Sequence, residues 1–285
     1  MPLNYERVIA FRPPEIRVSY GSRECILYAL GIGLGLDPLD RGQLKFVYEG
    51  AGLTAFPTMA AVLGWPGRLT NPDFGIDETR VVAGDLKVAL HRPLAAQGCF
   101  LSRARVREVI DKGPGNAAIV LNTRDLVAED GTVVATVDSS TFARGHGGFG
   151  GPVKEGPRPA AVPDCAPDLI CDLPTSPNLA LLYRLNGDDN PLHADPERAK
   201  LAGFERPILH GAASFGIAAH AILRTCAAYD AERLATIEAR FSRPIFPGET
   251  IRTEIWRSRQ LISFRCRVVE RDALVLSNGL ALLRS

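Results

Sequence analysis

The sequence predicts an α+β protein of two similar halves, each an antiparallel sheet wrapped around a central helix. Two observations lead to this prediction. In each half, an apolar segment rich in small residues is followed by segments in which apolar and polar residues alternate. A period of two is typical of strands with one buried face, and short turns between such strands indicate antiparallel pairing. A stretch rich in glycine and proline separates the two halves.

The N-terminal half begins with an apolar segment, residues 53–65, that we expect to be its helix. The alternating segments that follow are the expected strands, at residues 85–90, 99–110, 117–122 and 132–142. Arg92-Pro93-Leu94 follows the first of these strands, and Arg243-Pro244-Ile245 holds the corresponding place in the other half. This echo agrees with an internal duplication, although such a short match is weak support for one.

The composition changes abruptly over residues 145–177, where a run of glycines gives way to prolines. Such a stretch is typical of a linker, because structureless loops of this length are uncommon inside a compact domain. We therefore expect an N-terminal domain at 1–150, a linker at 151–177 and a C-terminal domain at 178–285. A long surface loop within one domain is the alternative.

The C-terminal half has the clearer pattern. Residues 210–229 are apolar on almost every side, which is typical of a helix that is buried all round. Alternating segments follow at 237–242, 251–256 and 262–268, with short turns between them. We expect the sheet formed by these strands to curl around the helix.

Charge and apolar content exclude several classes of protein. The chain has 285 residues, and its 33 Lys and Arg against 32 Asp and Glu give a formal charge of +1. Because charges of both signs are interleaved along the whole chain, no basic surface for nucleic acid is expected. The longest apolar run, residues 25–36, is too short to cross a membrane. No secretory segment is evident and the six cysteines form no CxxC pair, so we expect free thiols and a cytoplasmic location.

Reactive side chains are densest over residues 183–196, where two prolines and a Gly-Asp-Asp-Asn run exclude a continuous helix. Asp188 and His193 lie five residues apart in this expected loop, with Asn190 and a proline between them. Loops held by a rigid scaffold commonly carry catalytic groups. The two side chains can therefore be directed at one point in space.

Three interpretations of this loop remain open. Asp195 can cap a short helix that begins at Pro196, but this structural role does not explain Asp188 or His193. A metal site is the second interpretation, and its candidate ligands are Asp188, Asp189, Asn190, His193 and Asp195. The third is an acid–base pair, because histidine titrates near neutral pH and a neighbouring carboxylate can orient it.

Gly211 lies at the expected N-terminus of the buried helix. The backbone N–H of such a residue has no partner within the helix and lies at the positive end of the helix dipole, so it can stabilise a developing oxyanion. Close packing of the helix explains this glycine equally well. We assign His210 to packing or to the loop rather than to catalysis, and we attach no chemistry to His91, His146 or His220.

Long motifs surround these candidate residues. In the C-terminal half they are Tyr183-Arg184-Leu185-x-Gly187-Asp188-x-Asn190-Pro191-Leu192-His193-x-Asp195-Pro196, Ala202-Gly203-Phe204 and Pro207-Ile208-Leu209-His210-Gly211. In the N-terminal half they are Tyr28-Ala29-Leu30-Gly31, Phe46-Val47-Tyr48-Glu49-Gly50 and Gly147-Gly148-Phe149-Gly150-Gly151. With these motifs the sequence resembles the (R)-specific enoyl-CoA hydratases of the MaoC-like family, in their two-domain form found as the hydratase part of peroxisomal multifunctional enzymes. The resemblance covers nearly the whole chain and implies a tandem, or double, hot-dog fold.

The resemblance implies addition of water to a trans-2-enoyl-CoA, which gives a (3R)-3-hydroxyacyl-CoA. Asp188 and His193 would hold and activate the water and deliver a proton to C2, with Asn190 positioning the pair. The Gly211 N–H would bind the thioester oxygen. No metal and no cofactor are implied, since CoA is part of the substrate. The family also leads us to expect a homodimer.

The resemblance further implies substrate-binding residues at Glu49, Gly84, Lys112, Asp189 and Phe241. Lys112 would pair with a CoA phosphate, and Glu49 would support the site from the N-terminal half. Two-domain relatives often have His-Gly where this chain has Ala83-Gly84, so any contact made by that histidine is lost. Only the C-terminal half has the Asp-x-Asn-Pro-Leu-His loop. We therefore expect one active site per chain, with the N-terminal half forming a wall of the acyl pocket.

Two other functions compete with a hydratase of fatty-acid or sterol side-chain degradation. The same residues would serve a (3R)-hydroxyacyl dehydratase acting on acyl carrier protein or CoA, by microscopic reversibility. A non-catalytic acyl-CoA-binding module is the third function considered. The presence of both Asp188 and His193 argues against this module.

Overall fold

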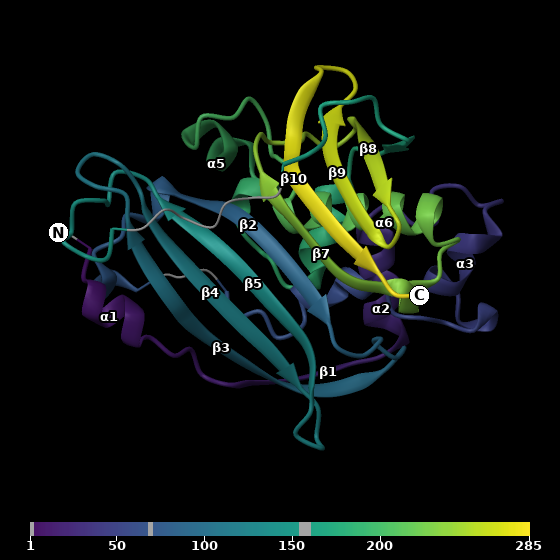
Figure 1. Ribbon diagram of the computed structural model, residues 1–285, viewed down its shortest axis with the longest axis horizontal. Helices are drawn as coiled ribbons and strands as arrows, with labels where there is room; N and C mark the ends of the chain where they lie inside the picture. The colour runs from purple at the N-terminus through teal and green to yellow at the C-terminus, as the bar shows by residue number, and fades with distance from the viewer. Residues whose placement is uncertain (1–2, 68–70, 154–160) are drawn as a thin grey trace.

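The computed structural model describes residues 3–67, 71–153 and 161–285. Its core is one antiparallel sheet of ten strands in the order β1-β3-β4-β5-β2-β7-β10-β9-β8-β6. The first five in this order come from the N-terminal half and the last five from the C-terminal half, so the two halves mirror each other. Figure 1 shows them side by side, joined at β2 and β7. The predicted α+β fold of two similar halves is confirmed.

The strands of the N-terminal half are β1 (Ile16–Tyr20), β2 (Val81–Leu90), β3 (Gly98–Asp111), β4 (Ala118–Val127) and β5 (Val133–Ala143). Those of the C-terminal half are β6 (Leu169–Pro174), β7 (Leu234–Phe241), β8 (Thr250–Ser258), β9 (Leu261–Val268) and β10 (Ala273–Leu283). Alternation in the sequence predicts all of these except β1, β6 and β10.

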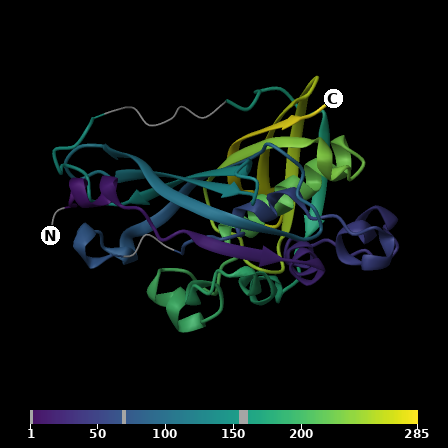
Figure 2. The same ribbon diagram turned by 90° about the horizontal axis from the view of Figure 1, so that it is seen from below.

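The α-helices are α1 (Tyr5–Ala10), α2 (Ser22–Gly31), α3 (Arg41–Val47), α4 (Leu179–Tyr183), α5 (Pro196–Leu201) and α6 (Gly211–Cys226). Short 3-10 helices are η1 (Glu49–Ala51), η2 (Pro57–Ala61), η3 (Pro72–Phe74), η4 (Glu78–Arg80), η5 (Arg184–Asn186), η6 (Pro191–His193) and η7 (Ala231–Arg233). Within the described ranges, no helix is long and apolar enough to span a membrane. Figure 2 shows the green helices of residues 179–201 on the same side of the sheet as the purple helix α2.

Helix α6 is the predicted buried helix, and the sheet of the C-terminal half wraps around it. Every residue from 213 to 223 is buried. In Figure 1 it lies behind β7, β10 and β9. On the side of α6 that faces away from the sheet, Gly216 permits close contact with Ile32, the residue that follows α2. A Cβ at position 216 would come within 2.5 Å of the Ile32 side chain. The N-terminal half thus packs directly on this helix.

The predicted helix over residues 53–65 is wrong. Only Pro57–Ala61 is helical, as the 3-10 helix η2. Pro57 disfavours a helix that runs through it from residue 53, and Gly64 adopts a φ of 60° on the C-terminal side. The segment is still buried. Its carbonyls at Ala60 and Ala61 accept hydrogen bonds from the Arg124 guanidinium of β4, at 3.2 and 2.6 Å, and the carbonyl of Leu63 accepts a third. A buried side chain therefore replaces part of the hydrogen bonding that a helix would provide.

The predicted linker at 151–177 contains part of the C-terminal sheet, so its C-terminal boundary requires correction. Leu169–Pro174 forms the edge strand β6, which pairs with β8. A proline at the end of an edge strand costs no hydrogen bond of the ladder, so Pro174 does not exclude a strand here. Residues 154–160 of the predicted linker lie outside the described residues.

Two ion pairs cross the junction between the halves. Arg240 of β7 lies opposite Asp85 of β2, with Nε 2.9 Å from Oδ1, and Lys87 lies opposite Glu238 with Nζ 3.1 Å from Oε2. These pairs are partly exposed, so their contribution to stability is small. The continuous hydrogen bonding of β2 with β7 fixes the position of the N-terminal half beside Phe241, the last residue of β7.

Candidate active site

The loop that carries Asp188 and Asn190 runs between η5 and η6 and is shaped by its own polar side chains. Oδ1 of Asp188 accepts a hydrogen bond from the backbone N–H of Asn190 at 3.2 Å. Oδ1 of Asn190 accepts one from the N–H of Leu192, also at 3.2 Å, and so caps η6. Asp and Asn commonly stabilise turns in this way. The turn places His193 at the end of η6.

His193 is 7% exposed and has one ring nitrogen fixed by the backbone. Its Nδ1 lies 2.9 Å from the carbonyl oxygen of Ile208, so this nitrogen carries the proton and donates it. The neutral ring then has Nε2 as an acceptor. In this tautomer Nε2 is the basic nitrogen of the His193 ring.

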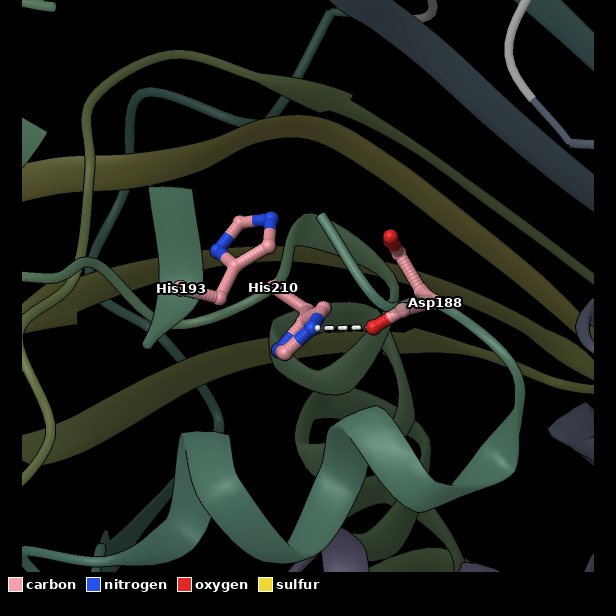
Figure 3. A group of neighbouring side chains, drawn as sticks. All are labelled: Asp188, His193 and His210. Atoms are coloured by element: carbon pink, nitrogen blue, oxygen red, sulfur yellow. Dashed lines mark hydrogen bonds between the residues drawn. The ribbon is translucent and has the colours of Figure 1, made fainter. Parts of the chain in front are cut away.

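His210, which the sequence assigned to packing or to the loop rather than to catalysis, completes the cluster. The fully buried ring stacks on His193 with centroids 3.7 Å apart, and Tyr183 packs on it at 5.0 Å. Its Nε2 donates to the backbone carbonyl of Asp188 at 3.1 Å, the dashed line in Figure 3. In the same view, the carboxylate of Asp188 and the ring of His193 extend on one side of His210. The motif Leu209-His210-Gly211 contained the signal for this role.

The protonation state of His210 follows from its surroundings. Burial, and then the nearby His193, lower the pKa of His210 to about 3. At neutral pH the ring is uncharged, and its N–H donates to the loop rather than exchanging protons with a substrate. Burial also raises the pKa of Tyr183, which remains a neutral phenol.

Gly211 and Phe241 lie next to each other, and Gly211 directly follows His210 of the cluster. Gly211 is the first residue of α6, so its N–H has no carbonyl partner within the helix. A Cβ at this position would lie 3.2 Å from Cε1 of Phe241. The Phe241 ring, at the end of β7, is thus packed against the N-terminus of α6.

A metal ion is compatible with the spacing of these side chains. Asp188, His193 and His210 each offer a ligand atom, and these atoms lie within 4.8 Å of one another. One nitrogen of each histidine is engaged by a backbone carbonyl, an arrangement that also fixes the tautomers of an acid–base pair. The structural interpretation of the loop does not account for this convergence.

The remaining predicted residues lie outside the cluster. Asp189, Glu49 and Lys112 are exposed, on the loop between η5 and η6, at the start of η1 and just after β3 respectively. Gly84 lies at an irregularity of β2, where a Cβ would come within 2.2 Å of the Phe142 ring, so packing alone requires a glycine. Their roles toward substrate stay predictions.

A cavity of about 150 Å³ lies elsewhere, among the segment that follows α2, β6 and α6. Its lining includes Ile32, Leu173, Ile217, His220 and Arg224, and none of the predicted site residues. The cavity is therefore separate from the cluster of Asp188, His193 and His210.

Comparisons with known proteins cover both halves. The N-terminal domain of MFE-2 hydratase 2 matches residues 18–145, and the MaoC like domain matches residues 159–278. Enoyl-CoA hydratase 2, peroxisomal, from Arabidopsis thaliana is 36% identical over 96% of this chain and 94% of that protein. The chain belongs to the MaoC-like enoyl-CoA hydratase 2 family. Enoyl-CoA hydratase ChsH3 of Mycobacterium tuberculosis is also 36% identical, over 97% of this chain and 98% of that protein.

Solved structures of family members agree with this assignment. A MaoC-like dehydratase from Phytophthora capsici superposes with a TM-score of 0.87 at 31% identity, over 99% of this chain and 98% of that one. The full-length peroxisomal multifunctional enzyme type 2 of Drosophila melanogaster gives 0.81 at 32% identity, over 95% of this chain and 48% of that one. The fold is the MaoC-like double hot-dog, as the motifs predicted.

Proposed function

We propose that this MaoC-like protein is an (R)-specific enoyl-CoA hydratase of fatty-acid or sterol side-chain degradation. It adds water to a trans-2-enoyl-CoA and forms a (3R)-3-hydroxyacyl-CoA. The observation that carries the proposal is the convergence of Asp188 and His193 beside the N-terminus of α6. Relatives named enoyl-CoA hydratase match nearly the whole chain, which supports it further.

The acid–base step uses the fixed tautomer of His193. The Asp188 carboxylate accepts a hydrogen bond from the attacking water and orients it, while Nε2 of His193 takes a proton from that water. The hydroxide oxygen forms a bond to C3 as the C2–C3 double bond breaks. The imidazolium of His193 then returns the proton to C2. One water is consumed, and no redox partner is needed.

The electrophilic step uses Gly211. As hydroxide reaches C3, negative charge develops on the thioester oxygen, and the Gly211 N–H is a donor placed to stabilise it. The helix dipole of α6 adds to this stabilisation. On this proposal no metal and no cofactor take part apart from the CoA of the substrate.

Turnover of a trans-2-enoyl-CoA by chelator-treated protein tests the proposal. Loss of the conjugated thioester absorbance is followed together with chiral analysis of the product, and we expect the (3R) isomer. His193→Ala and Asp188→Ala should each lower kcat at least about 10²-fold. His91→Ala, at an exposed histidine, serves as the control. Unchanged turnover in either site variant would contradict the mechanism, and activity that is lost on chelation and restored by a metal would favour the metal interpretation.

A second candidate is the reverse reaction. 3-hydroxyacyl-thioester dehydratase Y of Mycobacterium tuberculosis is 39% identical over 90% of this chain and 90% of that protein. The same residues would remove water from a (3R)-hydroxyacyl thioester. Comparing kcat/KM for matched CoA and acyl carrier protein thioesters, in both directions, distinguishes the two functions.

Location and assembly are separate proposals. The Arabidopsis thaliana relative and the multifunctional enzyme of Mus musculus carry the word peroxisomal in their names; the latter is 35% identical over 95% of this chain and 37% of that protein. These names favour a location other than the cytoplasm expected from the sequence. The proposed homodimer is tested by sedimentation of the purified protein.

A further inference from the structure

One buried carboxylate holds the glycine-rich loop of the N-terminal half. Asp111 is the last residue of β3 and is only 3% exposed. Its carboxylate accepts hydrogen bonds from the backbone N–H groups of Gly113 at 2.8 Å, Gly148 at 2.6 Å and Gly150 at 3.0 Å. Burial by itself would raise the pKa of Asp111, but these backbone donors lower the pKa below its usual value. The carboxylate is therefore ionised at neutral pH and remains bound to the loop.

The loop is also packed on both sides. The N–H of Gly147 donates to the carbonyl of Asn116 in the β3–β4 turn, at 2.9 Å, and a Cβ on Gly147 would come within 2.3 Å of the Gly113 carbonyl oxygen. On its other side, the ring of Phe149 stacks on Tyr5 of α1 with centroids 6.0 Å apart. Because loop 147–151 is held by these hydrogen bonds and by packing, it can fix the position of the residues next to it.

Exposed cations lie beside this loop. Lys112 follows Asp111 directly, and Arg144 follows β5; the register of β3, β4 and β5 places both at the same end of the sheet. The Asp111 carboxylate accepts hydrogen bonds from backbone N–H groups rather than forming an ion pair with Lys112. Within the described part of the chain, neither cation makes an ion pair, in contrast to Arg103 and Arg105 farther along β3. Two exposed cations at one end of a sheet, without an ion pair among the described residues, favour a polyanionic ligand.

The strand that carries Asp111 and the strand that ends at Phe241 are separated by a distance that CoA can span. From β3 to β7 there are four steps between neighbouring strands, which at about 4.8 Å per step gives on the order of 19 Å. The pantetheine arm of CoA separates its thioester from its phosphates by a comparable length. A thioester beside Gly211 thus allows the phosphates to reach Lys112.

We propose that Asp111 is a positioning residue for CoA recognition, which holds the loop 147–151 and the adjoining Lys112 so that Lys112 and Arg144 face the phosphates of the substrate. The glycine N–H groups do not bind the phosphates themselves, because Asp111 already accepts from Gly113, Gly148 and Gly150. This inference rests on the proposed hydratase function and extends it to the nucleotide end of the substrate.

Steady-state kinetics on two thioesters of the same acyl group test the proposal. One is the trans-2-enoyl-CoA and the other is the pantetheine thioester, which lacks the nucleotide and its phosphates. Asp111→Asn should raise KM for the CoA ester about 10-fold, which corresponds to one lost charge-assisted contact, and leave kcat unchanged. Both constants for the pantetheine ester should stay unchanged. Equal losses on the two esters, or no change on either, would overturn the proposal.

A matched control is available at the opposite end of the same strands. Asp130, in the β4–β5 turn, also accepts hydrogen bonds from its own turn, through the N–H and hydroxyl of Thr132. Asp130→Asn should leave both substrates unaffected. Should Asp130→Asn raise KM for the CoA ester as much as Asp111→Asn does, the effect would be one of general charge, and the assignment of Asp111 would be wrong.

A multiple-variant comparison shows whether Asp111 acts through the two cations. Lys112→Ala and Arg144→Ala together should raise KM for the CoA ester, and adding Asp111→Asn to them should cause little further increase, because both positioned groups are already lost. Additive effects would contradict the proposal. This comparison does not require Asp111→Ala, which risks unfolding the loop. If the wild type hydrates the pantetheine ester but shows no preference for CoA, this inference fails while the proposed function stands; if it hydrates neither, the proposed function fails.

Discussion

The rings of His193 and His210 stack with their centroids 3.7 Å apart, and His210 is the more deeply buried of the two. Burial and the neighbouring ring together keep His210 neutral. Its N–H can therefore remain on the carbonyl of Asp188 while His193 gains and loses a proton. We infer a division of roles, in which His193 transfers the proton and His210 positions the loop that carries Asp188.

His210→Ala tests this positioning role. Removing the ring leaves the Asp188 carbonyl without its donor, and a shift of this loop by a fraction of an ångström should lower kcat by about 10-fold or more. His210→Gln can still offer an amide N–H, so it should retain more of the activity. We expect the change mainly in kcat, because His210 is buried and does not reach substrate. Equal activity of both variants and the wild type would contradict the division of roles.

The free energy of unfolding should fall in mild acid because two histidines are buried in the neutral form. The pKa of His210 is lowered to about 3 and that of His220 to about 4, in both cases chiefly by burial. Below the unfolded pKa of about 6.5, the unfolded chain binds protons that the folded chain does not, so stability decreases as the pH falls. Each histidine contributes a loss of about 1.4 kcal/mol per pH unit between these limits.

Urea unfolding at about pH 7 and about pH 5 measures this dependence. His210→Gln should remove about half of it, because His220 remains. A wild type whose stability is the same at both pH values would show that the folded chain takes up these protons.

Gly211→Ala tests the contact between the helix N-terminus and Phe241. The added Cβ would lie 3.2 Å from the ring, so the ring or the helix start has to move by a few tenths of an ångström. Because the N–H of Gly211 is the proposed oxyanion donor, we expect kcat to fall by about 10²-fold while the fold is kept. Far-UV circular dichroism and kcat, measured side by side, check both parts. Activity within twofold of the wild type would remove Gly211 from the proposed mechanism.

The sequence predicts those elements whose patterns are local. Residues 210–229 are apolar on all sides, and the structure buries this helix within the sheet. Asp195 and Pro196 begin α5 as their capping pattern predicts. β6 was missed because it is a short edge strand ending in Pro174, and its pairing with β8 comes from a distant part of the chain.

In the candidate site, too, the residues that are close in sequence could be predicted and those brought together by the fold could not. Asp188, Asn190 and His193 are close in sequence, so one turn brings them together and the motif reveals them. His210 lies 17 residues after His193, and its role depends on a stacked ring and on a carbonyl that no residue pattern records. The positions of Lys112 and Glu49 relative to the cluster depend on how the two halves join, which the sequence does not indicate.

Arg124 is the residue whose loss should most disturb the N-terminal half. It is 5% exposed and donates to the carbonyls of Ala60, Ala61 and Leu63, in the segment that is buried without being a helix. Burial lowers the pKa of Arg124 to about 10, so the guanidinium is still charged at neutral pH. Arg124→Met fills a similar volume but leaves three buried acceptors unpaired, at about 1–3 kcal/mol each. We expect a loss of several kcal/mol in urea unfolding at neutral pH.

Arg124→Lys separates charge from geometry in the same position. Lysine keeps the positive charge, but its ammonium cannot reproduce the planar fork that reaches carbonyls on successive residues. If the fork holds this segment, Arg124→Lys should lose nearly as much stability as Arg124→Met. If charge alone were sufficient, Arg124→Lys would match the wild type. We therefore expect the free energy of unfolding of both variants to lie well below that of the wild type. The reason is that carbonyls of this segment are paired by the Arg124 side chain, whereas in an α-helix they would be paired by backbone N–H groups.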